Sequence, residues 1–205
     1  MKLKKGLLVV FEGIDGSGKT TQAKLLFEYL KKKGLDVILS KEPTNSVFGE
    51  KIMELANGER DFVRPIDEYN LFLNDRKVHV ENLIKPALKE KKIIVLDRYY
   101  FSTIAYQGAL GLDPKKIKAE NESFAPRPEI VFLISLKAQV GLSRIKNKRN
   151  EDPNLFEREE NLNKVNRIFN SLKEDYIVNV EGMNQIGDIH KTIIQTIETV
   201  LADFL

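Results

Sequence analysis

Cysteine is missing from this sequence of 205 residues. Disulfide bonds and thiolate metal sites are therefore excluded. Long apolar runs are missing too: the run Leu7–Phe11 is too short for a signal peptide or a membrane span, and a glycine-rich loop follows it at once. We therefore expect a cytoplasmic protein without a membrane partner.

An excess of charge of one sign is also missing. The formal net charge is only +3, because lysine and glutamate residues are mixed along the chain. The densest basic cluster, Arg144 to Arg149, is short, whereas a nucleic-acid-binding protein more often concentrates basic residues on one face. We therefore expect a small anionic partner and no nucleic acid. Binding of DNA by this cluster is kept as the third hypothesis about function.

Short apolar runs alternate with longer segments of helical periodicity. The runs show no polar alternation, which is typical of strands that are buried on both faces of a sheet. They are Leu7–Phe11, Val37–Leu39, Ile93–Leu96, Ile130–Ile134 and Tyr176–Val180. This order predicts an α/β fold with a doubly wound, mainly parallel five-stranded sheet and helices on both faces. The length fits a single domain over residues 1–205.

Three further segments complete the predicted fold. A helix is expected from Lys19 to Lys33, ending at Gly34, and an amphipathic helix from Ile186 to Phe204. Residues 146–160 are the most polar and least periodic part of the chain. They predict a surface loop or a short mobile lid.

A glycine-rich loop lies between the first expected strand and the first expected helix. Glycines let such a loop curl so that successive N–H groups and the helix N-terminus point at phosphate oxygens. In the P-loop pattern, Lys19 can bridge the β- and γ-phosphates of ATP, and the Thr20 hydroxyl can reach Mg²⁺. A glycine-rich turn without a ligand is the alternative interpretation. The predicted ATP site comprises Gly13, Ile14, Asp15, Gly16, Ser17, Gly18, Lys19, Thr20 and Thr21.

The P-loop alone does not separate GTPases, motor ATPases and small kinases. A GTPase usually carries an Asn-Lys-x-Asp motif that reads the base, and the nearest match here, Asn147-Lys148-Arg149-Asn150, lacks the aspartate. Motors and large ATPases need a longer chain. A small-molecule kinase is the remaining class.

The segment that follows the third expected strand makes a resemblance specific. Its sequence, Val95-Leu96-Asp97-Arg98-Tyr99-x-x-Ser102-Thr103-x-Ala105-Tyr106-Gln107, is similar to the signature of the thymidylate kinases. The triplet Lys41-Glu42-Pro43, the segment from Leu71-Phe72 to Arg76, and Arg127-Pro128-Glu129 also occur in that family's order. The resemblance spans essentially the whole chain. It implies transfer of the ATP γ-phosphoryl group to dTMP, giving dTDP and ADP, in the synthesis of dTTP.

Two residues at the end of the third strand fit this chemistry. Asp97, an acid beside the P-loop, can hold Mg²⁺ through its waters. Arg98 can place its guanidinium between the donor and acceptor phosphates, where charge accumulates during transfer. A structural ion pair at the strand end is the alternative for both. Because the acceptor phosphate is already ionised, we predict no general base.

The resemblance also implies an acceptor site. Asp15 would accept a hydrogen bond from the deoxyribose 3′-hydroxyl, and Tyr106 would leave no space for a 2′-hydroxyl. Phe72 would stack on thymine and Arg76 would donate to its O4. An aromatic residue at helical spacing is more often part of the core, which is the alternative for Phe72. Two further residues, Thr103 and Gln107, would lie near the edge of the base.

Several positions depart from the family's usual pattern. Thr44 and Asn45 replace glycines that often follow Glu-Pro, so the geometry of that loop is expected to differ. Lys41 replaces an arginine that grips the acceptor phosphate, so it supplies charge without a bidentate fork. Met53 replaces a second phosphate-binding arginine of many bacterial relatives, and Ser135 replaces an acid. Gly16 stands where some relatives carry a catalytic arginine. The missing charge must then come from elsewhere.

The predicted lid is the natural source of that charge. Arg149 is the first candidate for the catalytic residue, and Arg144 and Lys148 are the alternatives; Arg144 is also predicted to contact ATP. Closure of the lid would exclude water from the phosphates. Solvated surface charges are the equally weighted alternative for any one of these residues.

The predicted function is therefore that of a magnesium-dependent dTMP kinase. The nearest alternative is a P-loop kinase of another pyrimidine deoxynucleotide or of a deoxynucleoside. An alternative of a different class is a nucleotide-binding regulator without turnover. The resemblance further implies a homodimer that packs through helices flanking the sheet.

Overall fold

A parallel sheet forms the centre of the molecule. The computed structural model describes residues 3–58, 63–149 and 159–205. In these ranges five strands form one sheet in the order β2-β3-β1-β4-β5, and every strand pairing is parallel. The strands are β1 (Leu7–Glu12), β2 (Val37–Lys41), β3 (Ile93–Asp97), β4 (Ile130–Ser135) and β5 (Ile177–Glu181). The predicted α/β fold is confirmed.

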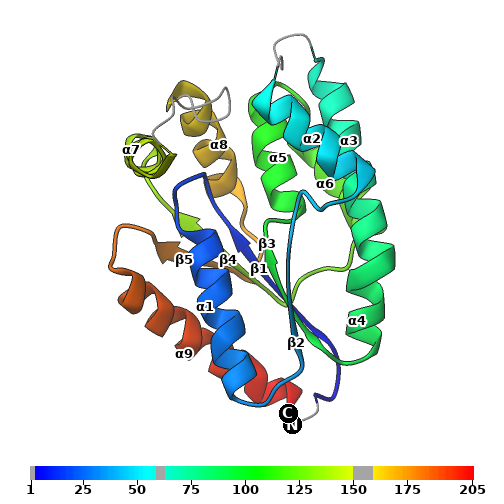
Figure 1. The fold of residues 1–205 in the computed structure, drawn as a ribbon, viewed down its shortest axis with the longest axis vertical. Helices are drawn as coiled ribbons and strands as arrows, with labels where there is room; N and C mark the ends of the chain where they lie inside the picture. Colours follow the sequence, from blue (N-terminus) through cyan, green and yellow to red (C-terminus); the bar gives the residue numbers. More distant parts are fainter. Residues whose placement is uncertain (1–2, 59–62, 150–158) are drawn as a thin grey trace.

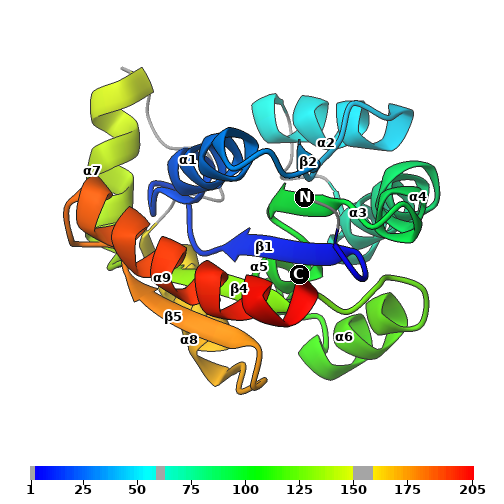
Figure 2. The ribbon, with the colours of Figure 1, turned by 90° about the horizontal axis from the view of Figure 1, so that it is seen from below.

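Helices cover both faces of this sheet (Figure 1). Figure 2 shows α1 and α9 on one side of it and α6 on the other. The ends of the described chain meet, because the Lys4 N–H donates to the Phe204 carbonyl at 2.8 Å. The helices are α1 (Lys19–Lys32), α2 (Val47–Asn57), α3 (Pro65–His79) with a π-helical turn η2 (Val80–Ile84) leading to α4 (Lys85–Lys89), α5 (Tyr100–Ala109), α6 (Pro114–Glu122), α7 (Ala138–Arg149), α8 (Glu159–Ser171) and α9 (Ile186–Phe204).

The alternation of side chains along each strand divides the core into two halves. In β1, Leu7, Val9 and Phe11 pack against α1 and α9. Leu8 and Val10 point the other way and pack among side chains of α3, α4, α5, α6 and α8. Because both faces are covered, the central strands β1, β3 and β4 are buried almost throughout, as predicted.

The edge strands differ from the prediction of full burial. Only Val37 of β2 and Val180 of β5 are buried, because an edge strand has a neighbour on one side alone. Every strand also extends one or two residues beyond its apolar run. The added ends are polar, and in a parallel sheet they gather at one edge, where ligands of such folds bind. These ends are Glu12, Lys41, Asp97, Ser135 and Glu181.

The loop conformation predicted for residues 146–160 is wrong at the two ends of this segment, which are helical. The backbone of α7 continues through Arg149, and α8 begins at Glu159. Lysine and arginine are good helix formers even where no apolar period is present, so the helix extends into the polar segment. Residues 150–158 lie outside the described ranges. The side chains of Lys148 and Arg149 also lie outside the described part of the structure.

The two helices predicted in detail are confirmed with small changes. At the end of α1, Gly34 adopts a φ of 74°, and the Leu35 N–H donates to the Leu30 carbonyl at 3.2 Å. A glycine in this conformation directly after a helix is a common way to end it. In α9, Ile186 is exposed at the first position of the helix, whereas Ile189, Ile193 and Ile197 are buried. Among the described helices, none is both long and apolar enough to cross a membrane.

The loop between β2 and α2 is fastened to α3 by Asp75. Its carboxylate accepts hydrogen bonds from the Thr44 N–H at 2.9 Å, the Thr44 hydroxyl at 2.5 Å and the Ser46 hydroxyl at 2.7 Å. Ser46 in turn caps α2 by accepting from the N–H groups of Phe48 and Gly49. Thr44 therefore has a structural role, which accounts for one departure from the family's usual loop sequence.

Gly49 is required at the crossing of this loop and α2. A Cβ at this position would lie 2.0 Å from the Thr44 carbonyl oxygen, so Gly49→Ala must displace backbone. We expect a loss of about 1–3 kcal/mol in the free energy of unfolding. The matched control is Gly187→Ala in α9, where a Cβ meets nothing within 4 Å. This substitution should raise the free energy of unfolding by up to about 1 kcal/mol. Urea denaturation measures both changes, and equal effects of the two substitutions would contradict this packing.

Candidate active site

The P-loop joins β1 to α1 and leaves the N-terminus of the helix open. Gly18, the residue before α1, provides no side-chain cap, and the first turn holds no acidic residue. The first N–H groups of α1 are therefore available to an anion. The buried Ser17 hydroxyl also has no hydrogen-bond partner among the described residues. These features match the loop predicted to bind phosphate.

Helix α7 presses against the P-loop through two glycines. Gly16 has a φ of 79°, and a Cβ there would lie 2.5 Å from the Gly141 carbonyl oxygen. A Cβ on Gly141 would in turn lie 2.6 Å from the Asp15 carbonyl oxygen. An arginine in place of Gly16 would therefore require α7 to move. The contact explains why this chain carries no cationic side chain at that position.

Asp15 brings together three of the residues predicted from the sequence. Its carboxylate accepts a hydrogen bond from Arg98 Nη2 through one oxygen, which also lies 3.5 Å from Lys19 Nζ. Its other oxygen lies 3.3 Å from the Tyr106 hydroxyl, which donates to it. The Arg98 guanidinium lies 5.2 Å from the centre of the Tyr106 ring. The P-loop, the end of β3 and α5 thus meet at the Asp15 carboxylate.

The charges of this cluster are set by burial and by each other. Burial alone would raise the pKa of Asp15, but Arg98 and Lys19 outweigh it and hold the pKa well below its usual range. Burial lowers the pKa of Lys19, and the charge of Arg98 lowers it further. Burial and Asp15 raise the pKa of Tyr106, so its hydroxyl keeps the proton that it donates. Asp15 is therefore an anion at neutral pH.

A second carboxylate, Asp97, lies at the end of β3 beside the first turn of α1. Its Oδ2 accepts a hydrogen bond from the Thr20 hydroxyl at 2.5 Å. Its Oδ1 is buried and has no partner among the described residues. Carboxylate and hydroxyl oxygens are ligands that Mg²⁺ accepts, and Mg²⁺ typically takes one or two carboxylates together with substrate phosphates. In the described ranges no three acidic or histidine residues cluster as a metal cage. The donor set thus fits the predicted ion.

Glu12 is a buried residue of the site that the sequence interpretation missed. It ends β1 and is fully buried. Its Oε1 accepts hydrogen bonds from the N–H groups of Tyr99 at 2.8 Å and Ser102 at 3.1 Å, and its Oε2 accepts from the Ser102 hydroxyl at 2.5 Å. That hydroxyl accepts from Arg98 Nη1 at 2.8 Å. A charged residue directly after a buried apolar run was the available signal.

Arg76 is held in a buried polar cluster. Its Nε donates to Glu42 at 2.8 Å, its Nη1 to Asn121 at 2.6 Å, and its Nη2 to Thr103 at 2.9 Å. Nη2 also lies 2.7 Å from Glu42, so these contacts engage four of the five N–H donors of the guanidinium. Glu42 also contacts His79 Nδ1 at 3.0 Å. The structure brings Arg76 and Thr103 together, and Glu42 and Asn121 hold Arg76 in place, a role that the sequence indicates for neither of them.

The remaining residues predicted for the acceptor differ in their surroundings. Phe72 is half-buried and belongs to neither core cluster, whereas its helix neighbours Tyr69 and Leu73 are buried core residues. The core alternative for Phe72 is therefore not favoured. Gln107 is fully buried, and neither polar atom of its side chain has a partner among the described residues. Lys41 is exposed at the end of β2.

Arg144 joins the P-loop to the turn after β5. Its guanidinium donates to the carbonyl of Gly16 at 3.2 Å and to that of Gly182 at 3.1 Å. Gly182 is itself packed closely, since a Cβ there would lie 2.7 Å from the Ser135 carbonyl oxygen. Ser135 also donates to the Val180 carbonyl at 3.2 Å, which gives this departure from the family pattern a role between β4 and β5.

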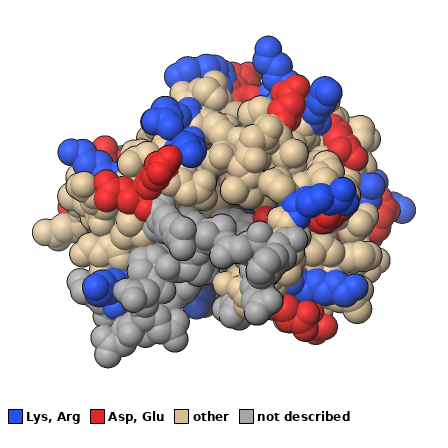
Figure 3. Space-filling model, turned by 90° about the horizontal axis from the view of Figure 1, so that it is seen from above, with Lys and Arg blue, Asp and Glu red and all other residues tan. Residues whose placement is uncertain are grey.

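Three further residues named from the sequence are Thr21, Met53 and Arg149. Thr21 is half-buried in α1, and Met53 is exposed on α2. The first candidate for the catalytic lid residue, Arg149, has its side chain outside the described ranges. Figure 3 views the molecule from above and shows basic and acidic side chains interspersed around this face. That view agrees with the mixed charge of the sequence.

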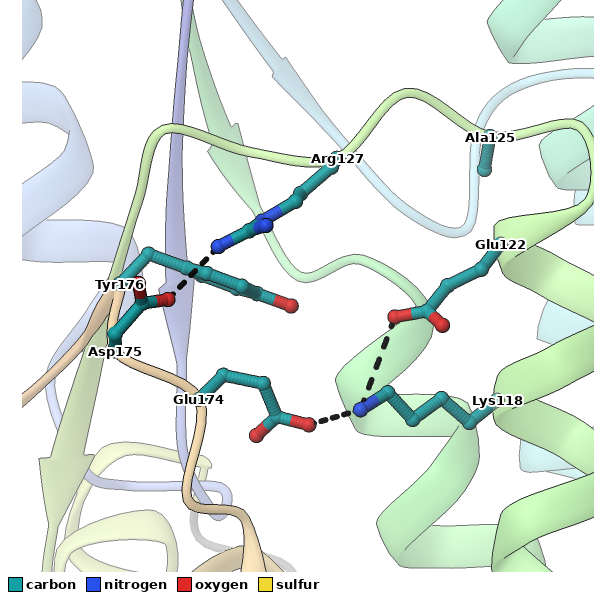
Figure 4. Close-up of a pocket in the computed structure, with 7 residues that line it drawn as sticks. All are labelled: Lys118, Glu122, Ala125, Arg127, Glu174, Asp175 and Tyr176. Atoms are coloured by element: carbon teal, nitrogen blue, oxygen red, sulfur yellow. Dashed lines mark hydrogen bonds and ion pairs between the residues drawn. The ribbon is translucent and has the colours of Figure 1, made fainter.

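A surface pocket of about 480 Å³ lies far from these residues (Figure 4). Arg127 and Tyr176 precede β4 and β5, so the pocket sits at the sheet edge opposite the P-loop. Its charges are paired: Lys118 with Glu174, and Arg127 with Asp175 at 2.7 Å. It gathers none of the residues predicted to act on a nucleotide. The pocket lined by Lys118, Glu122, Ala125, Arg127, Glu174, Asp175 and Tyr176 is therefore not assigned to the reaction.

The burial of Glu12 predicts a pH dependence of stability. Burial raises the pKa of Glu12 from 4.5 to about 7, although Arg98 and the Ser102 hydrogen bonds oppose the shift. Between these values the folded chain holds a proton that the unfolded chain has released, so stability falls as the pH rises and levels off above about 7. The shift corresponds to about 3 kcal/mol.

Glu12→Gln removes this titration. From pH 5 to pH 8, the free energy of unfolding of the variant should rise relative to that of the wild type by up to about 3 kcal/mol. Urea denaturation of both proteins at the two pH values measures the difference. The same pH dependence in both proteins would contradict a buried, raised-pKa Glu12.

Comparison with known proteins agrees with this geometry. A family model described as thymidylate kinase matches residues 11–193. A thymidylate kinase of Desulfotalea psychrophila is 46% identical over 201 residues, which cover 98% of each chain. One of Akkermansia muciniphila is 42% identical over 87% of this chain and 85% of that protein. A probable thymidylate kinase of Archaeoglobus fulgidus is 37% identical over 95% of this chain and 96% of that protein. The P-loop, the residues that end the strands and these matches lead to one conclusion: the chain belongs to the thymidylate kinase family.

Proposed function

We propose that this protein transfers the γ-phosphoryl group of ATP to the 5′-phosphate of dTMP, giving dTDP and ADP. In this reaction the bond between the γ-phosphorus and the β–γ bridging oxygen breaks, and a bond to an oxygen of the acceptor phosphate forms. The observation that carries the proposal is the cluster of Asp15, Lys19, Arg98 and Tyr106, which joins the phosphate-binding loop to α5. Membership of the family supports the same reaction.

The donor side is assigned to the P-loop and its neighbours. The loop from Gly13 to Thr21 would bind the phosphates of ATP through backbone N–H groups and Lys19 Nζ. Arg144, which already contacts the loop and the turn at Gly182, would lie beside the donor nucleotide. Arg98 would place its guanidinium between the two phosphates, where charge accumulates during transfer.

The metal site is assigned to Thr20 and Asp97. The support is the buried Asp97 Oδ1 without a partner in the described structure, next to the Thr20 hydroxyl. Bound Mg²⁺ would neutralise charge on the β- and γ-phosphates. Thr20 and Asp97 would hold the ion and its waters, and the phosphates would supply the remaining ligands.

The acceptor side is assigned to residues of α3 and α5. Tyr106 and Asp15 would contact the deoxyribose, and the Tyr106 ring would occupy the space of a 2′-hydroxyl. The half-buried Phe72 would stack on thymine. The contacts of Arg76 with Glu42, Asn121 and Thr103 engage four of its five guanidinium N–H groups, and the fifth would donate to O4. Gln107, Thr103 and Lys41 would complete the site at the base and the acceptor phosphate.

Several predictions about the whole protein accompany this assignment. We propose that the segment over residues 146–160 closes on the phosphates, with Arg149 as the first candidate to neutralise charge there. A single domain, a homodimer and a cytoplasmic location are further predictions that rest on the sequence and on the family resemblance.

Acceptor preference tests the proposed function. ADP formation from ATP and Mg²⁺ is measured with dTMP, dUMP, UMP, dCMP, dGMP, AMP and thymidine. We expect strong turnover with dTMP, weaker turnover with dUMP, and at least about 100-fold less with UMP, because Tyr106 excludes the 2′-hydroxyl. Preference for thymidine would favour a deoxynucleoside kinase. Tight ATP binding without turnover of any acceptor would favour a nucleotide-binding regulator.

Asp97→Asn tests the metal site. The substitution keeps an oxygen for the Thr20 hydroxyl and removes the charge that would hold the ion. At 1 mM Mg²⁺, we expect kcat/KM to fall about 10- to 100-fold and to recover in part at higher Mg²⁺. The control is Asp175→Asn, an exposed residue at the opposite edge of the sheet. Unchanged Mg²⁺ dependence in Asp97→Asn would remove Asp97 from the metal site.

A further inference from the structure

Glu12 is connected to Arg98 through a single hydroxyl group. Ser102 Oγ donates to Glu12 Oε2 at 2.5 Å and accepts from Arg98 Nη1 at 2.8 Å. The other terminal nitrogen of Arg98 is held by Asp15. Nη1 is thus held by Ser102, which in turn bonds to Glu12 at the end of β1, and Nη2 is held by Asp15 within the P-loop.

The backbone around Arg98 depends on the same carboxylate. Arg98 adopts a φ of 73°, a region that residues other than glycine rarely occupy. Its own N–H donates to the Phe11 carbonyl at 3.0 Å, and the next N–H, that of Tyr99, donates to Glu12 Oε1. The strained turn is therefore held on both sides by the end of β1.

A purely stabilising role explains Glu12 poorly. Its carboxylate is fully buried, and burial raises its pKa, so the charged form opposes folding above neutral pH. An uncharged side chain of the same shape would cap α5 without that cost. A buried charged residue that lowers stability and lies beside a functional site is more often retained for function than for stability.

We propose that Glu12 is a positioning residue for phosphoryl transfer, acting through the Ser102 hydroxyl to fix the Arg98 guanidinium. The inference rests on the role proposed above for Arg98. The carboxylate orients the hydroxyl so that its lone pair faces Arg98 Nη1, while Asp15 orients Nη2. The guanidinium is then set in place before the substrates arrive, and no reorientation is needed during the reaction.

Glu12→Gln separates this role from capping. The amide oxygen keeps the bonds from the Tyr99 and Ser102 N–H groups, because a flipped amide would place its NH₂ against two donors. The NH₂ then faces Ser102 Oγ as a donor, and the hydroxyl loses the acceptor that orients it. Ser102→Ala removes the hydroxyl alone and leaves both backbone bonds to Glu12. We call the chain of hydrogen bonds from Glu12 through the Ser102 hydroxyl to Arg98 the relay. If one variant fails to fold, the other still tests this relay.

The experiment measures kcat and the KM for dTMP at saturating ATP and Mg²⁺. Glu12→Gln and Ser102→Ala should each lower kcat about 10- to 100-fold, the effect expected for a misplaced catalytic group. The KM for dTMP should stay within about twofold, because α5 remains capped. The double variant should be no slower than the slower single variant, because both act on one relay.

Two further variants make failure interpretable. Glu129→Gln is the matched control: Glu129 also accepts a backbone N–H of β1, that of Leu8 at 2.9 Å, but at the opposite end of the strand. Its kcat should equal that of the wild type. Arg98→Ala tests the underlying assignment, and wild-type turnover in that variant would overturn the role of Arg98.

Loss of turnover in Arg98→Ala together with normal kcat in Glu12→Gln and Ser102→Ala would overturn the positioning role alone. A raised KM with unchanged kcat in Glu12→Gln would also overturn it, since Glu12 would then only hold α5 and the acceptor residues. Additive losses in the double variant would show that Glu12 and Ser102 do not act through one relay, and would contradict the proposal.

Discussion

The arrangement of the site depends on one carboxylate, that of Asp15, which contacts two basic side chains. Lys19 and Arg98 both contact Asp15 beside the P-loop, and the charge of Arg98 adds to burial in lowering the pKa of Lys19. Asp15 lies between them, and through Tyr106 it also reaches α5. The same arrangement lets the chain fold around two basic side chains and places both of them beside the P-loop. Stability and substrate affinity therefore draw on the same few contacts.

Much of this arrangement can be predicted from the sequence, because it follows from patterns within short segments of the chain. The apolar runs predict the strands, and the P-loop pattern predicts the loop and the helix that follows. Asp15 and Lys19 belong to that loop, and Asp97 and Arg98 follow from the rule that the ends of parallel strands meet at one edge. The helical ends of the segment 146–160 were missed because lysine and arginine form helices without an apolar period.

The contacts that could not be predicted join residues far apart in the chain. Glu12 bonds to Ser102, Glu42 to Arg76, and Arg144 to the turn at Gly182. No periodicity or spacing records such pairs, because each depends on how two elements are packed. Likewise, Phe72 and its neighbours have the same helical period, and only the packing separates a half-exposed ring from the buried core.

The contact between Gly16 and Gly141 has a consequence for how such a site can change over evolutionary time. A side chain at Gly16 would meet the backbone of Gly141, and a side chain at Gly141 would meet the backbone of Asp15, so each glycine is required by the close approach of α7 to the P-loop. A mutation that places an arginine after Asp15 is harmful until the start of α7 has shifted, and a shift of α7 alone gains nothing. In this chain, a single substitution at Gly16 therefore cannot add a cationic side chain to the loop while α7 keeps its place.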